Sequence, residues 1–101
     1  LVYIAANVIE PPSIGIGKLT YDDVGKNVKV CGKVDSLSVS KNKHVFFDIV
    51  DSSGEIEVVV FNSSAEKLQA GTLKDNDTVC VSGQVDEYNN RLEILPKEIS
   101  R

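Results

Sequence analysis

The clearest hydrophobic pattern in the chain lies between Val45 and Phe61, where two runs of alternating residues flank Asp51–Gly54. A period of two sends successive side chains to opposite faces of a β-strand, so each run predicts a strand with one buried face. Asp and Ser bond their own backbone in tight turns and Gly accepts a positive φ, so the polar stretch predicts the turn of a β-hairpin. The predicted core side of this hairpin consists of Val45, Phe47, Ile49, Ile56, Val58 and Val60.

The opposite side of this predicted hairpin is also unusually apolar. It carries Phe46 and Val50 from the first run, and Val59 and Phe61 from the second. A sheet face that meets only water normally carries polar residues. This second face is therefore expected either to be covered by another part of the protein or to bind a ligand.

Two further segments share a repeated pattern that predicts strands. Asn27–Val39 and Thr78–Glu87 both contain the sequence V-x-V-x-G-x-V, with Gly32 and Gly83 at the same place in the repeat. An isolated glycine inside a strand marks a bulge or a sharp bend. Both strands are therefore expected to bend at this glycine, and matching bends would allow them to pair along their length.

The rest of the pattern predicts one short helix and a last hairpin. Ser63 followed by Glu66 is the capping-box signature of a helix start. The helix is expected to run for about two turns and to end at Ala70. Tyr88–Asn90 then indicates a hairpin turn, and Arg91–Leu95 indicates the last strand, which the following proline is expected to end.

These elements predict an all-β fold with one short helix. The connections are too short for parallel βαβ crossovers except at the helix, which excludes a doubly wound parallel sheet. A five-stranded Greek-key barrel, with the helix between strands 3 and 4, satisfies the order. We expect this domain over residues 18–101. It follows a leader over residues 1–17, in which Leu1–Ile9 is expected to be a strand or the end of a preceding element.

Length and composition restrict the class of protein further. A chain of 101 residues, 42% of them hydrophobic, is long enough for a single core. No run approaches the roughly 18 apolar residues of a membrane span, so no membrane partner is expected. The chain begins at Leu1 and contains no Met, which predicts a piece of a longer protein. Other domains of that protein are candidate partners, and the expected state is a cytoplasmic monomer.

The charge and the cysteines change this picture in two ways. A net charge of −4 weighs against nucleic-acid binding through bulk electrostatics, because Lys and Arg contacts to phosphates dominate non-specific affinity. Such binding would need a local basic patch and base stacking. Cys31 and Cys80 are too few for a zinc site. We expect reduced thiols, because the cytoplasm is reducing and cross-strand geometry tolerates few disulfides.

The residue types of catalytic and metal sites do not form a recognisable pattern. His44 is the only histidine, and no Ser or Cys nucleophile stands in a motif with it. The hairpin carboxylates are expected to divide between two faces and to be solvated rather than to bind a metal. The sequence therefore predicts no enzyme, no metal and no cofactor. The carboxylates in question are Asp48, Asp51, Glu55 and Glu57.

With the repeats and the segment Phe46–Gly54 in place, the chain resembles an OB-fold nucleic-acid-binding domain. The similar type is the anticodon-binding domain of class II aminoacyl-tRNA synthetases and of archaeal replication protein A and exonuclease-associated modules. The resemblance covers about residues 18–99, and its most specific part is F-hydrophobic-D-hydrophobic-x-D-x-x-G. It implies that Phe46 stacks a base, and Glu57 stands where such domains commonly have a Gln that contacts one.

In OB folds the ligand lies across strands 2 and 3, between the loop joining strands 1 and 2 and the loop joining strands 4 and 5. These loops are expected at Ser40–His44 and Tyr88–Arg91. The resemblance thus implies a module that binds single-stranded DNA or RNA, with DNA favoured, by stacking between basic rims. The alternative is an OB domain with a protein-binding or structural role. The candidate site residues are Lys33, Lys41, Lys43, His44, Phe46, Val59, Phe61, Tyr88, Asn90 and Arg91.

Overall fold

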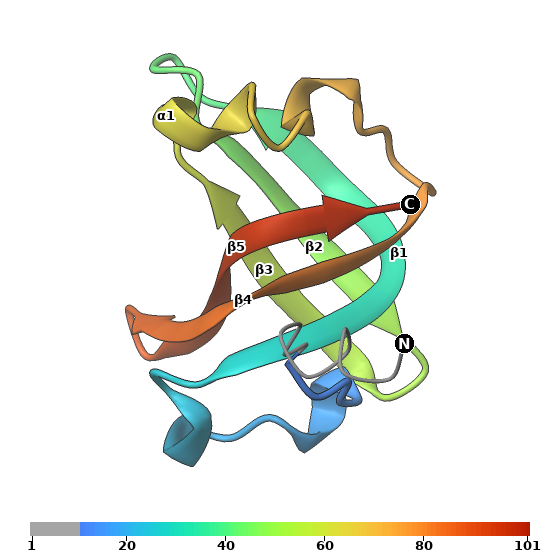
Figure 1. The fold of residues 1–101 in the computed structure, drawn as a ribbon, viewed down its shortest axis with the longest axis vertical. Coiled ribbons are helices and arrows are strands. Elements are labelled where there is room, and N and C mark those ends of the chain that lie inside the picture. The colour runs from blue at the N-terminus through green and yellow to red at the C-terminus, as the bar shows by residue number, and fades with distance from the viewer. Residues whose placement is uncertain (1–10) are drawn as a thin grey trace, which may run out of the picture.

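The computed structural model describes residues 11–101, and the segment Leu1–Ile9, expected to be a strand or the end of an element, lies outside the described residues. Five strands close into a barrel in the order β1-β2-β3-β5-β4 (Figure 1). The predicted all-β barrel with one short helix between β3 and β4 is confirmed. The strands are β1 (Asn27–Val39), β2 (Val45–Asp51), β3 (Gly54–Val60), β4 (Thr78–Tyr88) and β5 (Arg91–Ser100).

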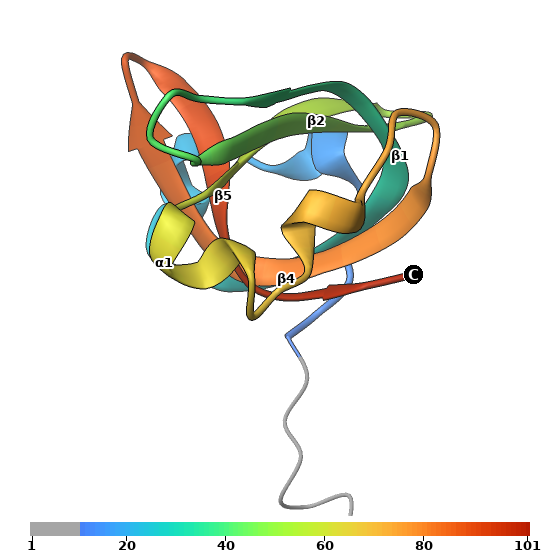
Figure 2. The same cartoon turned by 90° about the horizontal axis from the view of Figure 1, so that it is seen from above.

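Short helices occupy the two ends of the barrel. The 3-10 helices Ile16–Lys18 and Tyr21–Asp23 precede β1 at one end. Helix α1 (Asn62–Ala65) and the 3-10 helix Ala70–Thr72 lie between β3 and β4 at the other end (Figures 1 and 2). Within residues 11–101, no helix has the length and apolar character needed to cross a membrane.

Strand β1 is long because it serves two neighbours. Its first half, Asn27–Lys33, pairs antiparallel with β4, and its second half, from Lys33 to Val39, pairs antiparallel with β2. A Cβ atom on Gly32 would stand 2.3 Å from the Val50 carbonyl oxygen, and one on Gly83 would stand 2.3 Å from the Leu95 carbonyl oxygen. The predicted bends and the predicted pairing of the two V-x-V-x-G-x-V segments are both confirmed, because only glycine permits these approaches.

The barrel closes through a short parallel contact between β3 and β5, in which Glu57 pairs with Glu93 and Val58 with Ile94. The interior is filled by the alternate residues of all five strands. Phe47 is fully buried there, as the hairpin register predicts. The core cluster consists of Ile16, Val28, Val30, Val34, Val45, Phe47, Ile49, Ile56, Val58, Val60, Ala70, Leu73, Val79, Val81, Val85 and Ile94.

The segment before β1 is attached to the barrel at two places. The Ile14 amide donates to the Lys29 carbonyl at 3.0 Å, and the Lys29 amide donates to the Pro12 carbonyl at 2.9 Å. The Asp51 carboxylate in the β2–β3 turn accepts the Ile16 amide at 2.9 Å, and it also accepts the Ser53 hydroxyl and amide and a further turn amide. These donors, the Ile16 amide first, lower the pKa of Asp51 to about 2. The turn therefore carries a fixed negative charge that holds the segment in place.

Two predicted element ends are wrong. Helix α1 ends at Ala65 instead of continuing to Ala70, and the capping box of Ser63 does not form, because Phe61 is the N-cap residue and makes no side-chain cap. Strand β5 continues past Pro96 to Ser100. This is possible because β5 pairs only with β4 in that region, with a register shift at Gly83 opposite the proline. A proline is tolerated where its nitrogen has no ladder partner to supply.

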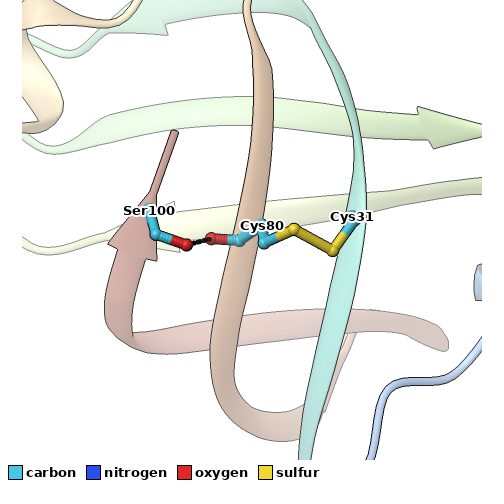
Figure 3. The surroundings of a disulfide bond; sticks show 3 residues. All are labelled: Cys31, Cys80 and Ser100. Atoms are coloured by element: carbon cyan, nitrogen blue, oxygen red, sulfur yellow. Dashed lines mark hydrogen bonds between the residues drawn. A yellow bond between two sulfur atoms is a disulfide. The ribbon is translucent and has the colours of Figure 1, made fainter.

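The expectation of two reduced cysteines is also wrong, because Cys31 and Cys80 form a disulfide (Figure 3). They are directly opposite each other in the β1–β4 ladder, with Cα atoms 4.0 Å apart. Both side chains point away from the core. The cysteines occupy neighbouring positions in the two repeats. The antiparallel register of β1 and β4 brings them directly opposite each other, so that the cross-strand bond can form. The Ser100 hydroxyl donates to the Cys80 carbonyl beside it at 3.5 Å.

We predict that reduction of this disulfide destabilises the barrel by about 2–4 kcal/mol, since the bond closes a loop with a sequence separation of 49 and restricts the unfolded chain. Urea unfolding with and without dithiothreitol measures this change. The Cys31→Ser/Cys80→Ser variant is the control and should not respond to the reductant. Equal unfolding midpoints for the oxidised and reduced wild type would contradict the prediction.

Candidate nucleic-acid interface

The outer face of the β2–β3 hairpin carries the apolar residues that the sequence predicts for it. Phe46 stands directly opposite Val59 in the register and is half-buried. Val59 is only 7% exposed although it lies outside the core cluster. The ring of Phe61, just beyond β3, is 50% exposed and meets the His44 ring edge to face at a centroid distance of 5.6 Å. The face therefore combines a covered apolar floor with exposed aromatic rings.

A groove of about 490 Å³ opens on this face. Three of its residues, Phe46, Glu57 and Val59, come from the hairpin strands. Tyr88, at the end of β4, contributes a ring that is 66% exposed. The distant hairpin β4–β5 thus supplies one side of a groove whose floor belongs to β2 and β3. Its lining residues are Phe46, Glu57, Val59, Phe61, Tyr88 and Glu93.

The loop between β1 and β2 is held against α1 by His44. The His44 Nδ1 atom accepts the Asn62 amide at 2.9 Å, and the Asn62 side chain donates to the Asn42 carbonyl at 3.1 Å. His44 therefore fixes the loop rather than presenting a free imidazole. Lys41 and Lys43 are exposed on this loop, and Lys43 has a φ of 67°. The loop can carry positive charge to the rim of the groove next to Phe61.

The turn between β4 and β5 directly follows Tyr88, which lines the groove. Asn89 and Asn90 have φ values of 53° and 63°, which fits the type I′ turns that match the twist of a hairpin. The Tyr21 hydroxyl donates to the Asn90 carbonyl, so the turn is tied to the helix before β1. Arg91 lines a second cavity, of about 340 Å³, together with Asp48 and other residues. Its charge is therefore directed towards carboxylates.

The predicted site residues fall into three groups. Phe46, Val59, Phe61 and Tyr88 converge on the groove. Lys41 and Lys43 are exposed on the β1–β2 loop, whose His44 contacts Phe61. Asn90 and Arg91 belong to the neighbouring cavity. Lys33 lines a separate hollow on β1 with Asp35, Val34, Val50 and Asn76.

A row of carboxylates runs around the outside of the barrel and passes through the groove at Glu57 and Glu93. Asp48 and Glu57 are both in this row, which corrects the expectation that the hairpin acids divide between two faces. The register pairs Asp35 with Asp48, Asp48 with Glu57, Glu57 with Glu93, and Glu93 with Asp86. One acidic residue from each strand thus stands in line around the outside of the barrel. Among residues 11–101, no three His, Cys, Asp or Glu side chains converge as metal ligands would.

Burial and neighbouring negative charges raise the pKa of two carboxyls in this row, Glu93 and Asp48. Burial, followed by the charges of Asp86 and Glu57, raises the pKa of Glu93. Burial also raises the pKa of Asp48, with added repulsion from Glu55 and Glu57 and a smaller opposing effect of Arg91. Sequence reasoning missed Glu93 and Asp86, because their place in the row depends on how β5 pairs with β3 and β4.

We predict that Glu93→Gln raises the melting temperature at pH 7. A carboxyl whose pKa is raised in the folded state binds its proton more tightly there than in the unfolded chain, so stability falls as pH rises above the ordinary value of 4.5. The neutral amide removes this loss. The advantage should vanish near about pH 3, where the carboxyl is protonated in both states. Calorimetry of wild type and Glu93→Gln at both pH values tests this, with the exposed Glu87→Gln variant as control. A melting temperature of Glu93→Gln below that of wild type at pH 7 would refute the prediction.

The strand order, the closure of the barrel and the groove on β2 and β3 define an OB fold. The family described as OB-fold nucleic acid binding domain, of the tRNA anticodon type, matches residues 28–101. The chain belongs to this family.

Two curated relatives illustrate the relationship. The chain is similar to the exodeoxyribonuclease 7 large subunit of Pseudomonas fluorescens, at 29% identity over 77 residues, which are 76% of this chain and 17% of that protein. It is also similar to the tRNA 2-agmatinylcytidine synthetase TiaS of Pyrococcus horikoshii, at 38% identity over 69 residues, which are 67% of this chain and 16% of that protein. The chain thus spans about a sixth of the length of these relatives.

Among solved structures, the asparaginyl-tRNA synthetase of Pyrococcus horikoshii superimposes with a TM-score of 0.75 at 20% identity. The superposition covers 86% of this chain and 21% of the synthetase. At this identity the likeness supports the fold.

Proposed function

We propose that this chain is the non-enzymatic, single-stranded nucleic-acid-binding module of a larger protein, with DNA favoured over RNA. The observation that carries the proposal is the groove in which Phe46, Phe61 and Tyr88 present aromatic surface over the floor of β2 and β3. Successive bases stack on such rings without regard to sequence, because every base has a π-face. The likeness to the large subunit of an exodeoxyribonuclease supports the preference for DNA.

The charges on this face indicate how a bound strand would run. Lys41 and Lys43 are exposed on the loop at one rim, where they can meet phosphates. The carboxylates of Glu57 and Glu93 lie on the floor and repel phosphates. A bound strand is therefore proposed to direct its backbone towards the lysine loop and its bases into the groove, which fits binding that depends more on stacking than on charge.

The second candidate function is an OB domain that binds a protein or another domain of the same chain. The acidic row favours it, since that row does not complement a polyanion. The expected monomeric state stays a prediction. So does the cytoplasmic location, and the Cys31–Cys80 disulfide does not favour it, because persistent disulfides belong mainly to oxidising compartments.

We predict that Phe46→Ala weakens binding of single-stranded oligonucleotides by about tenfold or more, because stacking contributes about 1–3 kcal/mol per base. Phe47 is the matched control, since its ring points into the core from the next position. Phe47→Ala should destabilise the barrel by about 3–5 kcal/mol, clearly more than Phe46→Ala does. Melting curves and fluorescence anisotropy with an oligo-dT and an oligo-rU probe measure both effects. A folded Phe46→Ala that binds as tightly as wild type would rule out the stacking site.

We predict a weak dependence of oligonucleotide binding on salt. With contacts from Lys41, Lys43 and one further cation such as Arg91, the slope of log K against log salt should be about −2. Oligonucleotide titrations at several KCl concentrations between about 50 and 200 mM measure this slope, because the screening of charges by salt changes strongly in this range. The Lys41→Ala/Lys43→Ala variant should make the slope shallower. A wild-type slope near zero would favour the protein-binding function instead.

A further inference from the structure

Within the described part of the chain, no ion pair within 4.0 Å ends on the carboxylate row on the outside of the barrel, and Arg91 acts on Asp48 only from a longer distance. In residues 11–101 the one ion pair within 4.0 Å joins Lys26 to Asp23, away from the row. Arg91 and Lys33 stand on neighbouring positions of β5 and β1 without pairing to it. Because adjacent strands lie about 4.8 Å apart, the row from Asp35 to Asp86 measures about 19 Å along the curved surface of the barrel. Such a length of unpaired negative charge complements a cationic segment.

Glu93 belongs to the carboxylate row and also lines the groove. It is only 8% exposed, yet no hydrogen bond or ion pair of the described residues ends on its carboxylate. No side-chain oxygen of residues 11–101 is both closed to solvent and without a partner, so the carboxylate opens into the groove that it lines. Most of the Glu93 side chain is buried while its carboxylate stays open, so a cationic group that enters the groove can meet this carboxylate directly.

The aromatic walls fit the same kind of ligand. Phe46, Phe61 and Tyr88 line the same groove as the carboxylates of Glu57 and Glu93. An Arg guanidinium or a Lys ammonium is attracted to the faces of such rings, and more strongly where water is excluded. Arg also covers apolar surface with its stem while its head meets a carboxylate. The groove thus combines the two kinds of group that bind a cationic side chain.

We propose that this face is the docking surface for an extended protein segment that carries Arg or Lys at alternate positions. One cationic side chain inserts between the rings and meets Glu57 and Glu93, and the others follow the row towards Asp48 and Asp35. Alternate side chains of an extended segment lie on one side about 6.6–6.8 Å apart, so three of them fit within the row. The inference goes beyond the proposed nucleic-acid binding, with which such a segment would compete for the groove.

The test uses a fluorescein-labelled peptide of three arginines alternating with threonines, measured by anisotropy at about 100 mM salt, where long-range attraction is screened. Wild type should bind it, and the same peptide with glutamine in place of arginine should not bind. The Glu57→Gln/Glu93→Gln variant should weaken binding by about tenfold or more. This variant removes repulsion, so it should remain folded.

The matched control is Glu66→Gln/Glu98→Gln, which changes the net charge equally at exposed carboxylates outside the row. It should bind the arginine peptide within about twofold of wild type, since exposed pairs contribute little. An equal loss in both double variants would overturn the proposal, because attraction would then depend on net charge alone. Failure of wild type to distinguish the two peptides would overturn it as well.

Binding of an oligonucleotide to the same variant shows whether the carboxylates of Glu57 and Glu93 serve a cationic protein segment or a nucleic acid. If they serve a cationic protein segment, Glu57→Gln/Glu93→Gln should bind oligo-dC at least as tightly as wild type, since two charges that repel phosphate are removed. The arginine peptide should also displace bound oligo-dC from wild type. Weaker binding of oligo-dC by this variant would assign the carboxylates to base recognition and overturn the proposal.

Discussion

The barrel depends on the close approach of backbone to backbone at Gly32. There β1 bends across the Val50 carbonyl oxygen of β2, at a distance that leaves no room for a side chain. Because of that bend, one strand completes its pairing with β4 and begins its pairing with β2. Gly83 makes the equivalent approach between β4 and β5. Without these two crossings, β2 and β3 would form an open sheet and the Tyr88 ring would not reach the groove.

Much of this fold follows from local patterns in the sequence. The alternation in Val45–Phe61 predicts the hairpin and assigns Phe47 to the core and Phe46 to the outside, as observed. The V-x-V-x-G-x-V repeat predicts the two bends. The end of β5 is not predictable in this way, since Pro96 is tolerated only because no second strand needs its missing donor. Capping fails similarly, because Phe61 rather than Ser63 precedes the first turn of α1.

The candidate site could be predicted only where its residues belong to one hairpin. Phe46, Val59 and Phe61 share a face within a single alternating segment, so the sequence places them together. Glu93 joins them through two parallel pairs between β3 and β5, segments far apart in the chain. The expected division of the hairpin acids between two faces is wrong for Asp48 and Glu57, because the hairpin pairs them directly. The expectation of reduced cysteines rests on the compartment and on the rarity of cross-strand disulfides, whereas the direct opposition of Cys31 and Cys80 in the ladder decides the outcome.

The disulfide also changes the covalent connectivity of the chain. Residues 32–79, which contain β2, β3, α1 and most of the candidate groove, form a closed covalent ring between Cys31 and Cys80. Tension applied at the two ends passes through the sulfur atoms and does not draw out this ring. A protease that cuts the Lys41–Lys43 loop opens the ring but releases no fragment until the sulfur bond is reduced. The part of the chain that carries the interface thus stays covalently attached when the loop is cut once, and it is not extended when the two ends are pulled.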